Sequence, residues 1–131
     1  VLEILYNILG ISEMEKVKYL PSIVYMALIF YFSSIPFPEH IPYPAFDPGK
    51  HILHLAEYAV LSTLLYYASH RSGESIIISS VYGLTDEVHQ YFVPLRFFDL
   101  YDLLFDCLGC IFGLCIVKIA MKMEGLLNRA T

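Results

Sequence analysis

Long apolar segments alternate with short polar connections along this chain. Four of them, at 17–34, 51–69, 75–93 and 100–121, come close to the roughly 20 mostly apolar residues that a helix needs to cross a bilayer. They lack the charged outer face that a soluble amphipathic helix shows, as the run IIISSVYGL at 76–84 illustrates. The pattern therefore predicts an all-α fold, an integral membrane bundle of four transmembrane helices.

The flanking segments differ in character from the predicted spans. Residues 1–16 are amphipathic rather than spanning, and this predicts a short N-terminal helix lying on the membrane. They have no basic region or cleavage site of a signal peptide. The run IPFPEHIPYPAFDPG at 35–49 predicts an irregular surface loop, because proline cannot continue a helix. We expect one membrane domain at 17–122 and a cytoplasmic tail at 123–131.

Composition and charge exclude two other classes of protein. With 57% hydrophobic residues and a mean hydropathy of +0.60 among 131 residues, the chain is too apolar for disorder. A net charge of -5 with only 8 Lys and Arg leaves no basic surface for nucleic acid.

The positive-inside rule gives the predicted orientation. One side of the predicted bundle carries Lys16, Lys18, Arg71, Lys118, Lys122 and Arg129, and the other carries Lys50 and Arg96. We therefore expect a multi-pass protein of the cell membrane with both termini in the cytoplasm.

Ionisable side chains gather at the predicted outer ends of three spans. They are His51, His54 and Glu57 in the second span, Asp86, Glu87, His89 and Gln90 in the third, and Asp99, Asp102 and Asp106 in the fourth. The three aspartates share one helix face and repel one another unless a cation lies between them. Arg96 is the nearest cation along the chain. Because such groups are costly within a membrane, this cluster is the candidate functional site.

Several of these segments resemble the VanZ-like family. The runs GLTDEVHQYFVPLR at 83–96 and DLLFDCLG at 102–109 resemble its signature. The run HLAEY at 54–58 is similar to its His-Phe-x-Glu-Tyr segment, and FSSIP at 32–36 to the end of its first span. The resemblance covers about residues 17–120. It implies a small four-span membrane protein, related to an accessory protein of glycopeptide resistance that is linked to teicoplanin tolerance.

The resemblance also singles out site residues. It gives weight to His54, Asp86, Glu87, Gln90, Arg96 and Asp102. The chain departs from the family pattern at two places. It has Lys50-His51 where the family has Asp-Lys, and Asp106 where the family has Asn.

The first functional hypothesis is recognition, with or without chemical modification, of a phospholipid or lipid-linked cell-envelope headgroup. In this hypothesis Arg96 binds the phosphate with Gln90, and Asp102 orients Arg96. The candidate catalytic groups are Asp86 and Glu87 as general base, with His54 as a second proton carrier. Membrane lipids, and a lipid-linked envelope intermediate among them, are the expected partners.

The second hypothesis adds a divalent metal. The spacings His54-x-x-Glu57 and Asp86-x-x-His89 are similar to those of carboxylate-bridged metal pairs in helix bundles. The candidate ligands are His54, Glu57, Asp86, His89, Asp102 and Asp106. Ligand sets rich in oxygen favour Mg, Mn or Ca over Zn.

The alternatives involve no catalysis. The chain could be an accessory or scaffold protein that alters envelope properties, with the polar cluster as a structural network joining the helices. Whether it is an enzyme stays open, and a transporter built from a homo-oligomer is a third class. Cys107, Cys110 and Cys115 are expected to be buried thiols. The Gly109-x-x-x-Gly113 motif predicts a close helix–helix contact.

Overall fold

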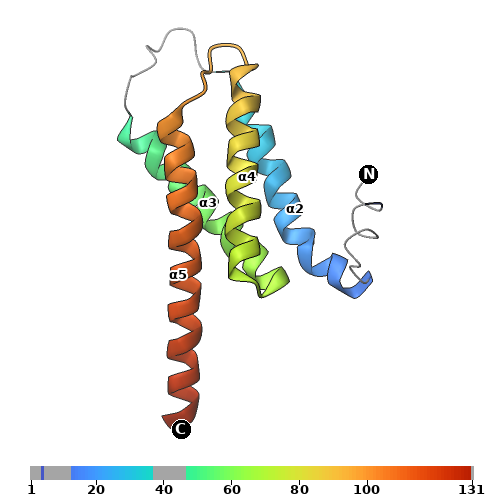
Figure 1. Cartoon of the computed structure of the whole chain (residues 1–131), viewed down its shortest axis with the longest axis vertical. Coiled ribbons are helices and arrows are strands. Elements are labelled where there is room, and N and C mark those ends of the chain that lie inside the picture. Colours follow the sequence, from blue (N-terminus) through green and yellow to red (C-terminus); the bar gives the residue numbers. More distant parts are fainter. Residues whose placement is uncertain (1–3, 5–12, 37–46, 131) are drawn as a thin grey trace.

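The chain folds into a bundle of long helices. A computed structural model describes residues 4, 13–36 and 47–130, and contains α2 (Glu13–Ser33), α3 (Pro48–Ser69), α4 (Ser72–Tyr91) and α5 (Leu100–Ala130) (Figure 1). No strand occurs in these described ranges. The all-α class predicted from the apolar segments is confirmed, and each helix overlaps one predicted span.

Local chemistry sets the helix boundaries near the site. Asp47 caps α3, because its Oδ1 accepts hydrogen bonds from the backbone N–H of Gly49 at 3.0 Å and of Lys50 at 3.3 Å. Pro48 suits the first turn, where no N–H is needed. Asp99 starts α5 in a similar way, accepting from the N–H of Tyr101 at 2.9 Å. The α3 cap begins the helix three residues before the predicted start and so brings Lys50 into it.

The helix α2 starts at Glu13, four residues before the predicted span, and ends before Pro36. It bends near its beginning (Figure 1), where Pro21 lies inside the helix and supplies no backbone N–H. The predicted amphipathic helix at 1–16 and the predicted loop at 35–49 fall largely outside the described residues.

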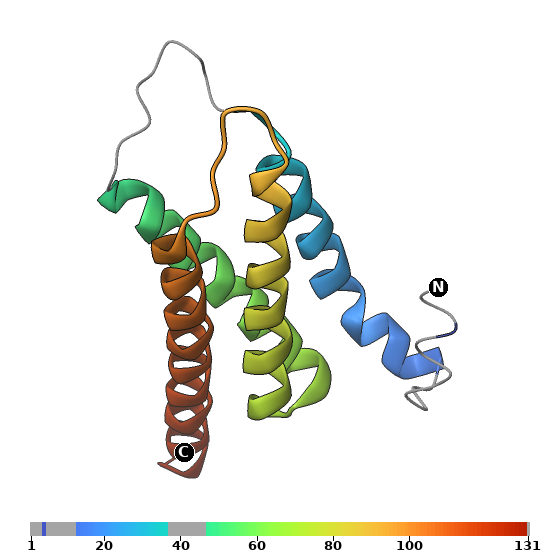
Figure 2. The same cartoon turned by 45° about the horizontal axis from the view of Figure 1, so that its top comes forward.

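The helix α3 lies at the centre of the bundle and packs against α2, α4 and α5 (Figure 2). Its apolar core residues are Tyr58, Leu61 and Leu65, which join Ile29 of α2 and Cys110 of α5. Gly109 and Gly113 lie directly against the α3 backbone, at the carbonyls of Leu55 and Ala59. The close contact predicted from the glycine motif is therefore present, and its partner is α3.

The helix α5 is much longer than its neighbours and extends beyond them at its C-terminal end (Figure 1). It continues through residues 123–130, which the sequence assigns to a tail. Among the described helices, Leu100–Arg129 is the one long and apolar enough to cross a membrane, and Val17–Ser33 is a shorter apolar segment. The prediction of four spans is thus supported for one helix and stays a prediction for the others.

The distribution of side chains is unlike that of a water-soluble bundle. Large apolar side chains are exposed on all four helices, for example Phe32, Leu53, Ile77 and Ile116. In the described part of the chain, the buried positions hold more polar than apolar side chains. An apolar exterior around a polar interior is the arrangement that a lipid surrounding favours.

Candidate functional site

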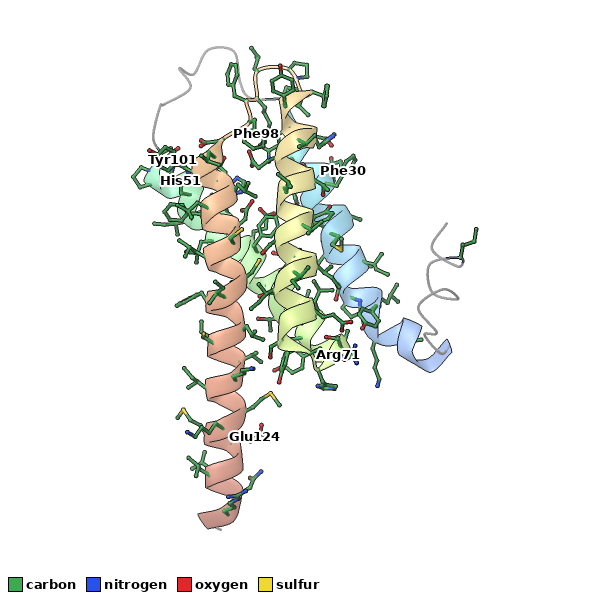
Figure 3. All side chains as sticks on the ribbon, in the orientation of Figure 1. Phe30, His51, Arg71, Phe98, Tyr101 and Glu124 are labelled. Atoms are coloured by element: carbon green, nitrogen blue, oxygen red, sulfur yellow. The ribbon has the colours of Figure 1, made fainter. Side chains whose placement is uncertain are left out.

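The buried ionisable groups lie at one end of the bundle. Figure 3 shows His51 of α3 and Tyr101 of α5 close together near the end where α5 begins, and Arg71 at the opposite end of α4. The sequence predicts that the ionisable side chains gather at one end of the bundle, and this is confirmed for the described residues. His51, His54, Asp86, Glu87, Gln90, Asp102 and Asp106 are all buried.

Two histidine–aspartate pairs join α3 to α5. His51 Nδ1 lies 2.7 Å from Asp102 Oδ1, and His54 Nδ1 lies 2.9 Å from Asp106 Oδ1. Because an ionised carboxylate only accepts, both contacts place the ring proton on Nδ1. His54 Nε2 then faces Asp102 Oδ2 at 3.6 Å. The His51 ring also stacks on Phe105, with ring centroids 5.1 Å apart.

Lys50 is the cation beside the helix face that carries Asp99, Asp102 and Asp106. Its Nζ forms an ion pair with Asp102 Oδ2 and lies 3.5 Å from Asp99 Oδ2. This corrects the expectation that Arg96 neutralises these aspartates and that Asp102 orients Arg96. Lys50 reaches the aspartates because α3 starts at Pro48, so that Lys50 lies on the first turn beside the start of α5.

Glu87 is fully buried between these groups. Its Oε2 accepts a hydrogen bond from the backbone N–H of Asp99 at 2.9 Å, which ties the end of α4 to the start of α5. Its Oε1 is buried and has no hydrogen-bond partner among the described residues. A buried carboxylate oxygen without a partner is costly, so this atom points to a ligand.

A second chain of contacts links α4 to the end of α2. Asp86 accepts from Ser33 Oγ at 2.6 Å and from Gln90 Nε2 at 2.9 Å. Gln90 Oε1 in turn accepts from Arg96 at 3.1 Å. The Arg96 guanidinium also donates to the carbonyls of Ile35 at 2.8 Å and Phe32 at 3.3 Å. Arg96 therefore closes the C-terminal end of α2 as well as facing the site.

His89 lies apart from the other candidate metal ligands. Its Nε2 is 2.9 Å from Ser34 Oγ, and its ring stacks on Phe30 with centroids 4.2 Å apart. Asp86 and His89 therefore do not meet at one ligand despite their i, i+3 spacing, because Asp86 contacts Ser33 whereas His89 contacts Ser34 and Phe30.

A cavity of about 230 Å³ opens beside this network, between α2, α3, α4 and the segment before α5. Its lining combines apolar, cationic and other polar side chains: Ile29, Phe32 and Leu53; Lys50 and Arg96; Ser33, His54, Glu57, Asp86 and Gln90. Glu57, predicted as a metal ligand, is thus a cavity residue. His54 belongs to both the cavity wall and the histidine–aspartate network.

Two groups of side chains in the described ranges have ligand atoms close enough to hold a metal ion. His54, Glu87 and Asp102 form one group, and His51, Asp99 and Asp102 form the other, with all ligand atoms of a group within 4.8 Å of one another. The predicted ligands His54 and Asp102 are among them. Glu57, Asp86, His89 and Asp106 are not in either group.

The sequence alone left Lys50 and Ser33 out of the candidate site, and it placed His51 in the cluster without giving it a role. His51 carries a signal, since His51 and His54 are three residues apart on one helix face and Asp102 and Asp106 are four apart on another. Two such pairs favour two contacts between the same helices. Ser33 carries no comparable signal, because a serine at the end of an apolar span is usual.

The family model described as VanZ/LLP1 matches residues 15–121. The chain belongs to the VanZ/LLP1 family. Neither a curated protein nor a solved structure matches it. Family membership and the apolar helix α5 favour association with a membrane.

The two places where this VanZ/LLP1 chain departs from the VanZ-like pattern are in contact with the same network. Lys50 and His51 both contact Asp102, and Asp106 contacts His54. Residues at both departures are therefore partners of Asp102 and His54, whereas the other predicted residues Asp86, Gln90 and Arg96 lie in a separate chain of contacts.

Proposed function

We propose that this VanZ/LLP1 chain is a multi-pass protein of the cell membrane that recognises a phospholipid or lipid-linked envelope headgroup in the cavity beside Arg96. The four helices would all cross the bilayer, with both termini in the cytoplasm and the cavity near the outer leaflet.

The observation that carries the proposal is the mixed lining of this cavity. Lys50 and Arg96, which come from different segments, both line it and present two cations suited to a phosphate. Phe32 and Leu53 line it too, and they are 56% and 70% exposed. The polar interior is therefore continuous with an apolar exterior. An amphiphile fits such a surface, because its phosphate and its acyl chains would meet matching groups.

The roles in this proposal follow from the contacts. Arg96 would bind the phosphate while Gln90 holds its guanidinium, since NH1 donates to Gln90 Oε1 and further N–H groups on the fork can bind a ligand. Asp86 fixes Gln90 from the other side.

Chemical modification of the headgroup would need a general base. Asp86 lines the cavity and would be that base, whereas Glu87 is fully buried and does not line it. His54 lies on the same wall, with its Nδ1 held by Asp106. A divalent cation, Mg²⁺, Mn²⁺ or Ca²⁺, is the cofactor we expect beside a phosphate, because it would neutralise the developing charge.

Native mass spectrometry of the full chain in a gentle detergent tests this proposal. The samples are the wild type, Arg96→Leu, Lys50→Gln and the control Arg71→Leu, whose arginine pairs with Glu74 on the exposed opposite end. We expect phosphatidylglycerol added to the detergent to be retained by the wild type and the control, and lost about 10-fold more readily by the other two. Equal retention by all four samples, or equal retention of diacylglycerol, would overturn the proposal.

The accessory or scaffold function is the second candidate. The hydrogen bonds that Asp86 and Arg96 make to protein partners favour it. A purely structural network predicts that Asp86→Ala lowers the free energy of unfolding by several kcal/mol, because its partners lose their acceptor. At a functional site the same change leaves stability nearly intact or raises it. A thermal melt in detergent separates the two candidates.

A further inference from the structure

Three helices bring one ligand each to a single buried point. His54 comes from α3, Glu87 from α4 and Asp102 from α5, and their ligand atoms lie within 4.8 Å of one another. We propose that these three side chains bind one divalent cation of the Mn²⁺ type, at a site behind the cavity wall. This inference identifies the metal and the site within the proposed function, yet it stands on contacts that do not involve Arg96.

The arrangement of hydrogen bonds supports the site, because His54 and Glu87 are each held by one atom and offer the other, while Asp102 is held at Oδ1 and has Lys50 at Oδ2. His54 is held at Nδ1 by Asp106, Asp102 at Oδ1 by His51, and Glu87 at Oε2 by the N–H of Asp99. The remaining atoms are His54 Nε2, Asp102 Oδ2 and Glu87 Oε1. A carboxylate holding the distal nitrogen of a ligating histidine is the usual outer support of a metal site.

The buried oxygen of Glu87 is the independent observation. Glu87 is 0% exposed, and its Oε1 has no hydrogen-bond partner in the described part of the chain. Burying a carboxylate oxygen without a partner is unfavourable, because the oxygen loses its hydrogen bonds to water. A cation between the three helices would supply the partner that this atom lacks.

The charges around the proposed site also support a bound cation. Glu87, Asp99, Asp102 and Asp106 lie around the proposed site, and Lys50, a permanent cation, contacts two of them, Asp99 and Asp102. Lys50 forms its ion pair with Asp102 Oδ2, the same oxygen that a metal would bind. A bound cation would therefore displace the ammonium from Asp102, and Lys50 would keep its neighbour Asp99. Lys50 and the metal thus compete for one atom.

The donor set limits the choice of metal. One imidazole nitrogen with two carboxylates suits Mn²⁺, which accepts both donor types, better than Ca²⁺ or Mg²⁺, which favour oxygen alone. The second group, His51, Asp99 and Asp102, is the weaker candidate, because Lys50 already contacts both of its aspartates.

Titration of metal-free full chain in detergent with Mn²⁺, followed by the electron paramagnetic resonance signal of free Mn²⁺, tests the inference. We expect saturation at one ion per chain, and affinity at least about 100-fold weaker in Glu87→Gln and His54→Gln. The matched controls Glu57→Gln and His89→Gln should stay within about 2-fold of the wild type. Lys50→Gln should bind Mn²⁺ about 10-fold more tightly, a gain that misfolding cannot produce.

The bound ion also carries a spectroscopic signature. Electron spin-echo modulation from one imidazole nitrogen should be present in the wild type and absent in His54→Gln. No saturable binding by the wild type up to about 1 mM Mn²⁺, or unchanged binding in Glu87→Gln, would overturn the inference. Either result leaves the lipid-retention experiment on Arg96 unaffected, so the two proposals fail separately.

Discussion

Gly109 of α5 lies against the backbone carbonyl of Leu55 in α3. A Cβ atom built on Gly109 would lie 2.2 Å from that oxygen, well inside any real contact distance. Gly113 repeats the relationship one turn later against Ala59 at the same distance. The α3–α5 contact that carries the two histidine–aspartate pairs therefore depends on two positions without a side chain.

Gly109→Ala should separate α3 from α5. The neighbouring atoms are backbone and cannot rotate away, so we expect a loss of about 1–3 kcal/mol in the free energy of unfolding. Gly125→Ala in the same helix meets nothing within 4 Å and should stabilise the chain by up to about 1 kcal/mol. Thermal melts in one detergent compare the two variants, and similar melting temperatures would contradict the contact.

Arg96→Lys should loosen the end of α2. A lysine ammonium cannot reach Phe32 O, Ile35 O and Gln90 Oε1 together as the guanidinium fork does. Loss of a charge-assisted hydrogen bond costs about 1.5–3 kcal/mol, so amide exchange in residues 32–35 should accelerate at least about 10-fold. Hydrogen–deuterium exchange measures it, with Arg71→Lys as the control. Unchanged exchange would mean that Arg96 does not hold α2.

Cys115 should be shielded by lipid although no protein covers it. It is exposed on α5, whereas Cys110 is buried. If α5 crosses a bilayer, a membrane-impermeant maleimide should leave Cys115 unmodified in sealed vesicles and modify it in SDS, because the reagent needs water. Glu124→Cys, further along the same helix, is the accessible control after the vesicles are opened. Rapid modification of Cys115 in intact vesicles would exclude the span.

Asp106→Asn should preserve the fold, since an amide oxygen can still accept from His54 Nδ1. We expect the free energy of unfolding to change by less than about 1 kcal/mol, and Mn²⁺ affinity to fall about 10-fold. Asp106→Ala leaves the imidazole N–H without its acceptor and should cost about 1–3 kcal/mol. Equal stability of the two variants would show that the His54–Asp106 contact adds nothing.

Much of the fold was predictable because its elements are long and their apolar character is uniform. The four predicted segments overlap the four described helices, and the glycine motif correctly indicated a close contact. The helix starts were less predictable. Asp47 caps α3 within a proline-rich run that the sequence predicts to be a loop, so the helix starts earlier than predicted. At its other end, α5 continues past residue 121 because no proline or cap interrupts it.

The sequence predicted at which end of the bundle the site residues lie. It was less informative about which of these residues contact one another. Spacing within a helix places residues on one face, and it identified His54, Asp102 and Asp106. Which helix that face meets depends on packing, so the pairing of Asp102 with Lys50 and His51, in place of Arg96, followed only from the structure. His89 turned to α2 for the same reason.

The unequal lengths of the helices bear on the membrane that would suit this protein. At 1.5 Å per residue, the 22 residues of α3 span about 33 Å and the 31 residues of α5 about 46 Å. A hydrocarbon layer of about 30 Å matches α3 and leaves roughly the last third of α5 in the headgroup layer. There Leu126 and Leu127 would meet acyl chains while Lys122 and Arg129 met phosphates. A thicker bilayer would draw this segment inward, so bilayer thickness should set the tilt of α5 and, through Gly109, that of α3.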